Sequence, residues 1–212
     1  MTLPAEKLIT INDRGARVAT TFGSLSQGGA NMVFIKKLTA SSSGTLSFVD
    51  GASSVVLDNT YKEYLFTFKD IHPSNDNSRL TFNLSVDGGS NYNVTKTSTY
   101  FYAYNFENGS GADLEYNASG DLAQGTGFQE ITTEIGADAD QCSSGTLQLF
   151  NPSSTTFVKH FIAISNDAQS ENRDYTNYSA GYGNTTSAVD AIQFKMNSGN
   201  IDAGDICLYG IL

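Results

Sequence analysis

Short segments in which apolar and polar residues alternate strictly, each followed by turn-forming residues, recur along most of this 212-residue chain. A β-strand places successive side chains on opposite faces, so a period of two indicates strands that bury one face. No window shows the 3.6-residue apolar period of an amphipathic helix. The clearest strand is the segment 79–86 (RLTFNLSV), whose apolar residues share one face: Leu80, Phe82, Leu84 and Val86. The chain is therefore predicted to be all-β.

About ten such segments are predicted to be strands, and clusters of Gly, Asn, Ser and Asp separate them. Directly after the segment 79–86, Asp87-Gly88 favours the positive φ values of a tight hairpin turn. Long series of evenly spaced strands must close or fold into two sheets, so we expect an antiparallel β-sandwich of jelly-roll type. The predicted strands are Met32–Leu38, Thr45–Val49, Tyr61–Asp70, Arg79–Val86, Val94–Asn105, Gln129–Ile135, Thr146–Phe150, Phe157–Ser165, Val189–Met196 and Asp205–Ile211.

The first forty residues differ in charge from the remainder. They carry a net charge of +3 and the whole chain −10, so residues 41–212 carry −13. We therefore predict two parts, an extended N-terminal attachment arm (1–40) and a β-sandwich domain (41–212). Ordering an extended segment costs about 1–2 kcal/mol per residue in backbone entropy, so the arm needs a binding partner. The residues expected to attach it to another subunit or another protein are Leu8, Ile9, Ile11, Arg14 and Arg17.

Composition excludes several classes of protein. An acidic body repels phosphate backbones, so we expect no nucleic-acid binding. No apolar run approaches the length of a membrane span, and we expect no membrane insertion. Residues 1–11 lack the basic start and apolar centre of a secretion signal, which favours synthesis in a reducing cytosol. Cys142 and Cys207 are accordingly interpreted as free thiols, with a disulfide between them as the alternative.

Catalytic signatures are absent from the sequence. No nucleophile elbow, zinc-protease motif or phosphate loop occurs, and paired carboxylates for glycan hydrolysis cannot be nominated among 22 acidic residues. His160 alternates with apolar residues as on a strand face, and His72 lies in a polar loop. The loops 74–77 and 138–140 offer clustered oxygens for Ca²⁺, but Asp and Asn are also the usual residues of turns. We assign no catalytic residue, metal ligand or cofactor.

Tyrosines form two clusters that could bind a ligand or another subunit. An exposed tyrosine ring can stack on a sugar or anchor a protein interface. In a chain without Trp, however, tyrosine must also fill the core, so a core or subunit contact is the competing interpretation. The first cluster is predicted on one face of a strand and the second in a loop-like stretch: Tyr100, Tyr102 and Tyr104, then Tyr175, Tyr178 and Tyr182.

Three stretches carry a family resemblance. They are FTFKDIHPSNDNSRLTFNLSVDGGSNYNVTKT (66–97), CSSGTLQLFNPSSTTFVKHF (142–161) and AGYGNTTSAVDAIQFKMNSGNIDAGDICLYGI (180–211). Together they resemble a β-sandwich domain of virion structural proteins of marine bacteriophages, especially those that infect cyanobacteria. The resemblance covers about residues 45–212.

The resemblance implies a non-enzymatic protein on the virion surface, assembled in the host cytoplasm. It leaves two locations open: a decoration or cement protein on the head, or a tail, neck or fibre appendage that binds host-surface glycans. A glycan-cleaving enzyme on the same sandwich is a third hypothesis. The partners that the resemblance implies are further copies of the chain, expected as a trimer, and other virion proteins such as capsid or tail proteins.

Overall fold

The computed structural model describes residues 9–11, 17–19 and 32–212, and the chain divides into two compact units, Met1–Asn31 and Met32–Leu212. In the first unit, β1 (Ile9–Ile11) pairs antiparallel with β2 (Arg17–Ala19), so that Ile11 lies opposite Arg17. Ile9 and Ile11 thus have a strand partner within their own unit. Leu8 and Arg14 lie outside the described residues, and attachment of the arm to another protein stays a prediction.

The boundary predicted after residue 40 falls later in the chain than the boundary between the two units. β3 (Met32–Thr39) belongs to the second unit, where it pairs with β14 (Ile201–Ile211) at the edge of a sheet. Lys37 forms an ion pair of 3.1 Å with Asp205 across this pairing. Part of the basic charge assigned to the arm therefore neutralises a carboxylate of the sandwich.

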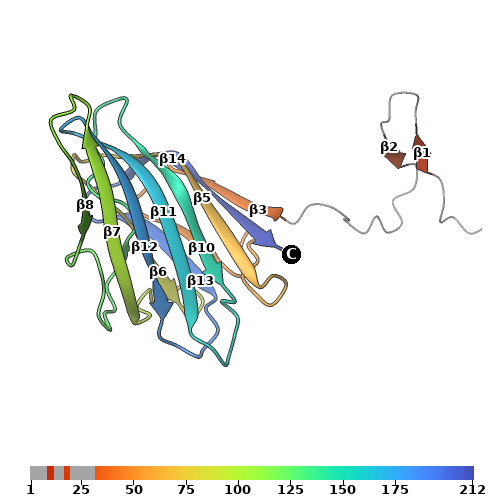
Figure 1. The fold of residues 1–212 in the computed structure, drawn as a ribbon. Coiled ribbons are helices and arrows are strands. Elements are labelled where there is room, and N and C mark those ends of the chain that lie inside the picture. The colour runs from red at the N-terminus through yellow and green to blue at the C-terminus, as the bar shows by residue number, and fades with distance from the viewer. Residues whose placement is uncertain (1–8, 12–16, 20–31) are drawn as a thin grey trace, which may run out of the picture. The chain divides into compact units, whose positions relative to one another are not determined.

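The second unit is all-β in its described residues, with two antiparallel sheets (Figure 1). The four-stranded sheet has the order β4-β13-β6-β9, with bounds Leu46–Val49, Ala191–Met196, Leu80–Ser85 and Gln129–Glu130. The eight-stranded sheet has the order β3-β14-β5-β10-β11-β12-β7-β8. Its remaining bounds are Glu63–Pro73 (β5), Ser143–Phe150 (β10), Lys159–Gln169 (β11), Arg173–Gly183 (β12), Lys96–Phe106 (β7) and Ala112–Tyr116 (β8).

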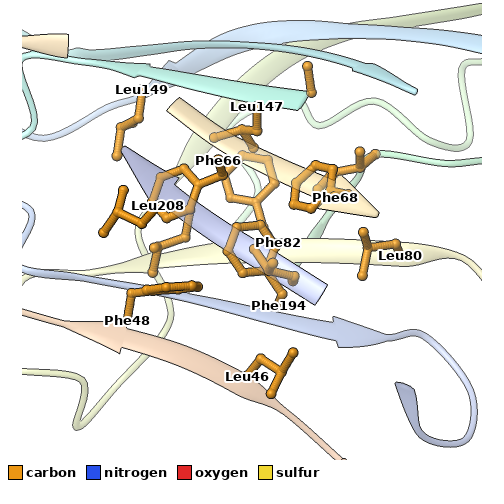
Figure 2. Packing of buried hydrophobic residues seen from close by; sticks show 14 of the residues in the cluster. Leu46, Phe48, Phe66, Phe68, Leu80, Phe82, Leu147, Leu149, Phe194 and Leu208 are labelled. Atoms are coloured by element: carbon orange, nitrogen blue, oxygen red, sulfur yellow. The ribbon is translucent and has the colours of Figure 1, made fainter. Parts of the chain in front are cut away.

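The core lies between the two sheets and is rich in phenylalanine (Figure 2). The ring of Phe194 on β13 lies 5.4 Å from those of Phe66 and Phe68 on β5, and the ring of Phe82 on β6 lies 5.0 Å from that of Phe161 on β11. Each contact joins one sheet to the other. Burying a phenylalanine side chain contributes about 1.5–3 kcal/mol, so these rings are the main source of cohesion between the layers.

The phase predicted for the segment 79–86 is confirmed for Leu80, Phe82 and Leu84, which are fully buried, and is wrong for Val86, which is 38% exposed. The strand ends at Ser85, so Val86 already belongs to the following turn. The polar face of β6 is buried as well, because loops cover it. The side-chain amide of Asn83, for example, donates to the carbonyls of three loop residues: Tyr92, Thr126 and Gly127.

The turn after β6 forms, but it does not make the predicted hairpin. Gly88 and Gly89 have positive φ, and the carboxylate of Asp87 accepts hydrogen bonds from Ser85 and Asn91. The next strand, β7, lies in the other sheet, while β6 pairs with β13 and β9. The turn therefore carries the chain from one layer of the sandwich to the other.

Two strands of the eight-stranded sheet were not predicted. β8 is short and exposed along its whole length, and β12 contains the tyrosine-rich stretch that the sequence indicated as loop. β12 is long because both of its neighbours are long: it pairs with β11 from Arg173 to Gly183 and with β7 over the same residues. Its polar residues Asn177 and Ser179 point into the sandwich, where a pattern read from the sequence expects apolar side chains.

Candidate functional site

The five strands at one side of the eight-stranded sheet present an apolar surface to solvent. β10, β11, β12 and β7 run side by side in Figure 1, and β8 follows at the edge. Residues of alternate parity point away from the core and form rows across the strands, such as Tyr116, Phe101, Tyr178, Ile164 and Thr146. Phe101 is 39% exposed and Ile164 41%. We call this surface the outer face.

Charged side chains are missing from most of the outer face, and the exception is Asp174 on β12, which points outward at the end away from the hollow and accepts a hydrogen bond from Asn166 (2.7 Å). Apart from Asp174, its outward-pointing residues are Thr, Ala, Ile, Phe, Tyr, His, Asn, Gln, Ser and Leu. They are Ser144, Thr146, Gln148 and Phe150 on β10; His160, Ile162, Ile164, Asn166 and Ala168 on β11; Thr176, Tyr178, Ala180 and Tyr182 on β12; Thr97, Thr99, Phe101, Ala103 and Asn105 on β7; and Ala112, Leu114 and Tyr116 on β8.

A hollow of about 490 Å³ opens at one end of the outer face. Its floor is shallow because Ala180 and Gly181 have little or no side chain, and larger side chains stand around them: Phe150, His160, Ile162 and Tyr182. His160 lies on the strand face as predicted, with its ring 6.0 Å from that of Tyr182. No carboxylate or hydroxyl nucleophile is paired with His160 in the described part of the chain. The lining suits an apolar side chain.

The predicted tyrosine clusters are regrouped by the fold. Tyr100, Tyr102 and Tyr104 share the inward-facing side of β7, and Tyr175 from β12 joins them, with its ring 5.3 Å from that of Tyr102 and 5.6 Å from that of Tyr104. Tyr178 and Tyr182 lie on the outer face instead, since they have the opposite parity on β12. There the ring of Tyr178 stacks on Phe101 at 5.0 Å.

A small polar groove of about 110 Å³ adjoins the inner tyrosines. Arg79 forms ion pairs in it with Glu130 (3.0 Å) and Glu134 (2.8 Å). Burial raises the pKa of Glu130, while the guanidinium of Arg79 acts in the opposite direction. Ring faces, a guanidinium and carboxylates around one groove are chemically suited to hydrogen-bond and stack on a sugar. The groove is lined by Arg79, Tyr102, Asn117, Thr133, Glu134 and Tyr175.

Behind these tyrosines, a buried carboxylate organises the inner side of the sheet. Asp167 on β11 accepts hydrogen bonds from Ser143 (2.6 Å), from Asn177 (2.6 Å) and from the backbone N–H of Thr133 (3.0 Å). Asn177 in turn accepts a hydrogen bond from the hydroxyl of Tyr100 (2.8 Å). Burial raises the pKa of Asp167 to about 6, although its donors favour the ionised form. This network joins β10, β11, β12 and β7 to the chain segment that follows β9.

The residues considered for catalysis or calcium binding are occupied by structural contacts. The loop position predicted for His72 is wrong, because His72 lies in β5, where it pairs with Ala203 of β14 and a ring nitrogen lies 2.7 Å from the carbonyl oxygen of Gln141. Asp76 accepts a hydrogen bond from the backbone of Ala137, and Asn77 accepts one from Ser170. Within residues 9–11, 17–19 and 32–212, no group of three or more His, Cys, Asp or Glu side chains is arranged to hold a metal ion. Both cysteines are free thiols.

Sequence reasoning did not find the outer face, although one signal was present. The run Phe161–Ile164 is apolar at both parities, which indicates a strand with two apolar faces. Phe161 and Ala163 fill the core, and Ile162 and Ile164 remain outside. The sequence alone does not say which of these pairs lies inside.

Comparison of the chain with protein-family models, with curated proteins and with solved structures finds no match. Among the residues that the structure describes, no helix is long and apolar enough to cross a membrane.

Proposed function

We propose that this protein is a non-enzymatic structural protein of a bacteriophage virion, displayed on the particle surface, where it decorates or cements the head. The observation that carries the proposal is the outer face, a wide apolar surface whose central rows carry no charged side chain, on a chain of net charge −10. Such surfaces are typical of protein–protein contacts. The sequence resemblance supplies the setting, a virion, and its partners, namely further copies of the chain and capsid or tail proteins.

We further infer that the sandwich is a jelly roll. The supporting observation is the distribution of eight strands between the sheets: β3, β5, β10 and β14 in one, and β4, β6, β9 and β13 in the other. Successive members of this set alternate between the layers, except that β6 and β9 share one sheet. This order is that of two nested Greek keys. The strands β7, β8, β11 and β12 are then insertions that widen one sheet and create the outer face.

The number of copies in each particle tests the proposal. Quantitative mass spectrometry of purified virions, calibrated against the major capsid protein, measures it directly. A head decoration protein is expected in hundreds of copies, because it follows the symmetry of the shell. A few to a few dozen copies would place the protein on the tail, neck or fibres. Absence from the particle would contradict the proposal.

A second candidate function, favoured by the groove beside Arg79, is binding of host-surface glycans by an appendage module. Tyr102 would stack on a sugar ring, and Glu134 and Asn117 would bind its hydroxyls. Binding of the purified protein to host lipopolysaccharide or capsule, measured by calorimetry and lost in Tyr102→Ala, would support this function. Release of reducing ends that depends on one carboxylate would instead identify an enzyme.

A further inference from the structure

We propose that copies of this chain bind one another through the outer face. This inference rests on the proposed function as an assembly protein and assigns the surface through which assembly takes place. Its starting point is the exposure of side chains that strands normally bury or replace with polar residues: Phe101, Tyr178, Ile162, Ile164, Leu114 and Tyr116 are all exposed on neighbouring strands.

The distribution of charge favours a second copy as the occupant. Between Lys96 and Lys159 the chain has no basic residue and eight acidic ones, yet none of these occupies an outward position on β7, β8 or β10, and Asp121 approaches the outer face only at its edge, where it accepts a hydrogen bond from the hydroxyl of Tyr116. Asp113 and Glu115 have the inward parity on β8, and Glu130 and Glu134 pair with Arg79. A basic partner would bind where the carboxylates are, on other parts of the surface, and not on the outer face. Two copies of an acidic chain repel each other least where neither carries charge.

The flat area of the outer face is about two thirds of the area that a standard interface buries on each partner. Five strands spaced by about 4.8 Å, with seven residues of about 3.3 Å each from Thr97 to Ala103, span roughly 24 by 23 Å, or about 550 Å² of flat sheet. The relief of the side chains and the walls of the hollow add to this area. A standard protein–protein interface buries about 800 Å² on each partner.

The loop before β11 carries an exposed aromatic side chain whose chemistry suits the hollow of the outer face. Phe157, in the loop before β11, is 68% exposed and lies three residues before His160, which lines the hollow. An apolar hollow of about 490 Å³ has room for an aromatic ring. We assign Phe157 of one copy to the hollow of another, so that each copy offers both halves of the contact. Such pairing generates a closed dimer or ring from identical surfaces.

The experiment uses the full chain and measures its mass in solution over a range of concentrations, by light scattering after size exclusion and by sedimentation equilibrium. The expected mass is a small multiple of 22.7 kDa. Raising the salt concentration to roughly 0.5 M is expected to tighten association, because it screens the repulsion between acidic chains and leaves the apolar contact intact.

Ile164→Lys places a charge in the centre of the outer face and should weaken association at least about tenfold. Phe157→Asp should have a similar effect through the hollow. The matched control is Val86→Lys, at an apolar residue of similar exposure that lies after β6 of the other sheet. Circular dichroism and a melting curve verify that each variant is folded.

A monomer at every concentration, or an Ile164→Lys variant that associates as tightly as Val86→Lys, would overturn the assignment. The proposed function has a separate readout, which is the copy number in virions. A monomeric chain that is still abundant in particles would leave the virion role standing and remove self-association. An oligomer that depends on the outer face but is absent from particles would support self-association and contradict the virion role.

Discussion

Lys96 is fully buried on β7, where its amine donates hydrogen bonds to Asn83 and to the carbonyl of Val94. In the described part of the chain no carboxylate pairs with this amine. Desolvation lowers the pKa of Lys96 to about 7. The alternation of apolar and polar residues predicts that Lys96 is exposed. The sequence pattern therefore gives no sign that this lysine is buried.

The buried amine makes stability depend on pH. An unfolded lysine has a pKa of about 10.4, so between pH 7 and 10 the unfolded chain binds the proton that the folded chain has lost. The free energy of unfolding should therefore rise with pH above 7. Urea unfolding of Lys96→Met at pH 7 and pH 9 should lack this rise, whereas Lys62→Met, at an exposed lysine, should retain it. Equal slopes in both variants would show that the Lys96 amine does not titrate in this range.

Asp167 gives a second pH dependence, of opposite sign. Its folded pKa of about 6 lies above the unfolded value of about 3.9, so its contribution to stability is full below pH 4 and is lost as the pH rises to about 6. Asp167→Asn should remove this slope and keep the fold, because the amide oxygen accepts from Thr133 and Asn177 while Ser143 becomes an acceptor. Asp167→Leu should lose about 3 kcal/mol or more, since buried donors are left unpaired. Unfolding curves at pH 4 and pH 7 measure both effects.

At the scale of the strand, β6 shows how one element serves two environments. Its apolar residues Leu80, Phe82 and Leu84 face the core, and its polar residues Thr81, Asn83 and Ser85 are buried beneath loops with hydrogen-bond partners. Both sides of the strand are therefore buried: the apolar side chains lie in the core, and the polar side chains lie beneath loops, where they are hydrogen-bonded. Unpaired polar groups in such a place are costly, so each polar side chain has its partner.

Phe82→Ala should lower the free energy of unfolding by about 3–5 kcal/mol, because it leaves a cavity beside Phe161 and Phe194 that the surrounding strands cannot fill. The melting temperature measured by calorimetry should drop sharply, or soluble folded protein should be lost. Val86→Ala, four residues later and exposed, should change stability by no more than about 0.5 kcal/mol. A melting curve of Phe82→Ala within a degree or two of the parent would contradict the observed packing.

At the scale of the whole molecule, the chain joins an acidic sandwich to an N-terminal unit, Met1–Asn31, that carries three basic and two acidic side chains. The sandwich has its own core, and its strands begin at Met32. Deletion of residues 2–30 should therefore leave a folded sandwich with an unchanged near-ultraviolet circular dichroism spectrum. If the segment is the anchor, the truncated protein should no longer join the virion. Incorporation at the parental copy number would assign attachment to the sandwich itself.

The sequence alone determined the class of fold, because a period of two is a local property of each strand. It also placed the inward face of residues 80–84 and put Tyr100, Tyr102 and Tyr104 on one side of their strand. Only the tertiary structure decided which strands are neighbours, and hence that Tyr175 joins those tyrosines while Tyr178 and Tyr182 face outward. It decided as well which side of the apolar run Phe161–Ile164 is the core. Alternation in the sequence shows that the two faces of a strand differ. Pairing between distant segments decides which of these faces is covered by the other sheet.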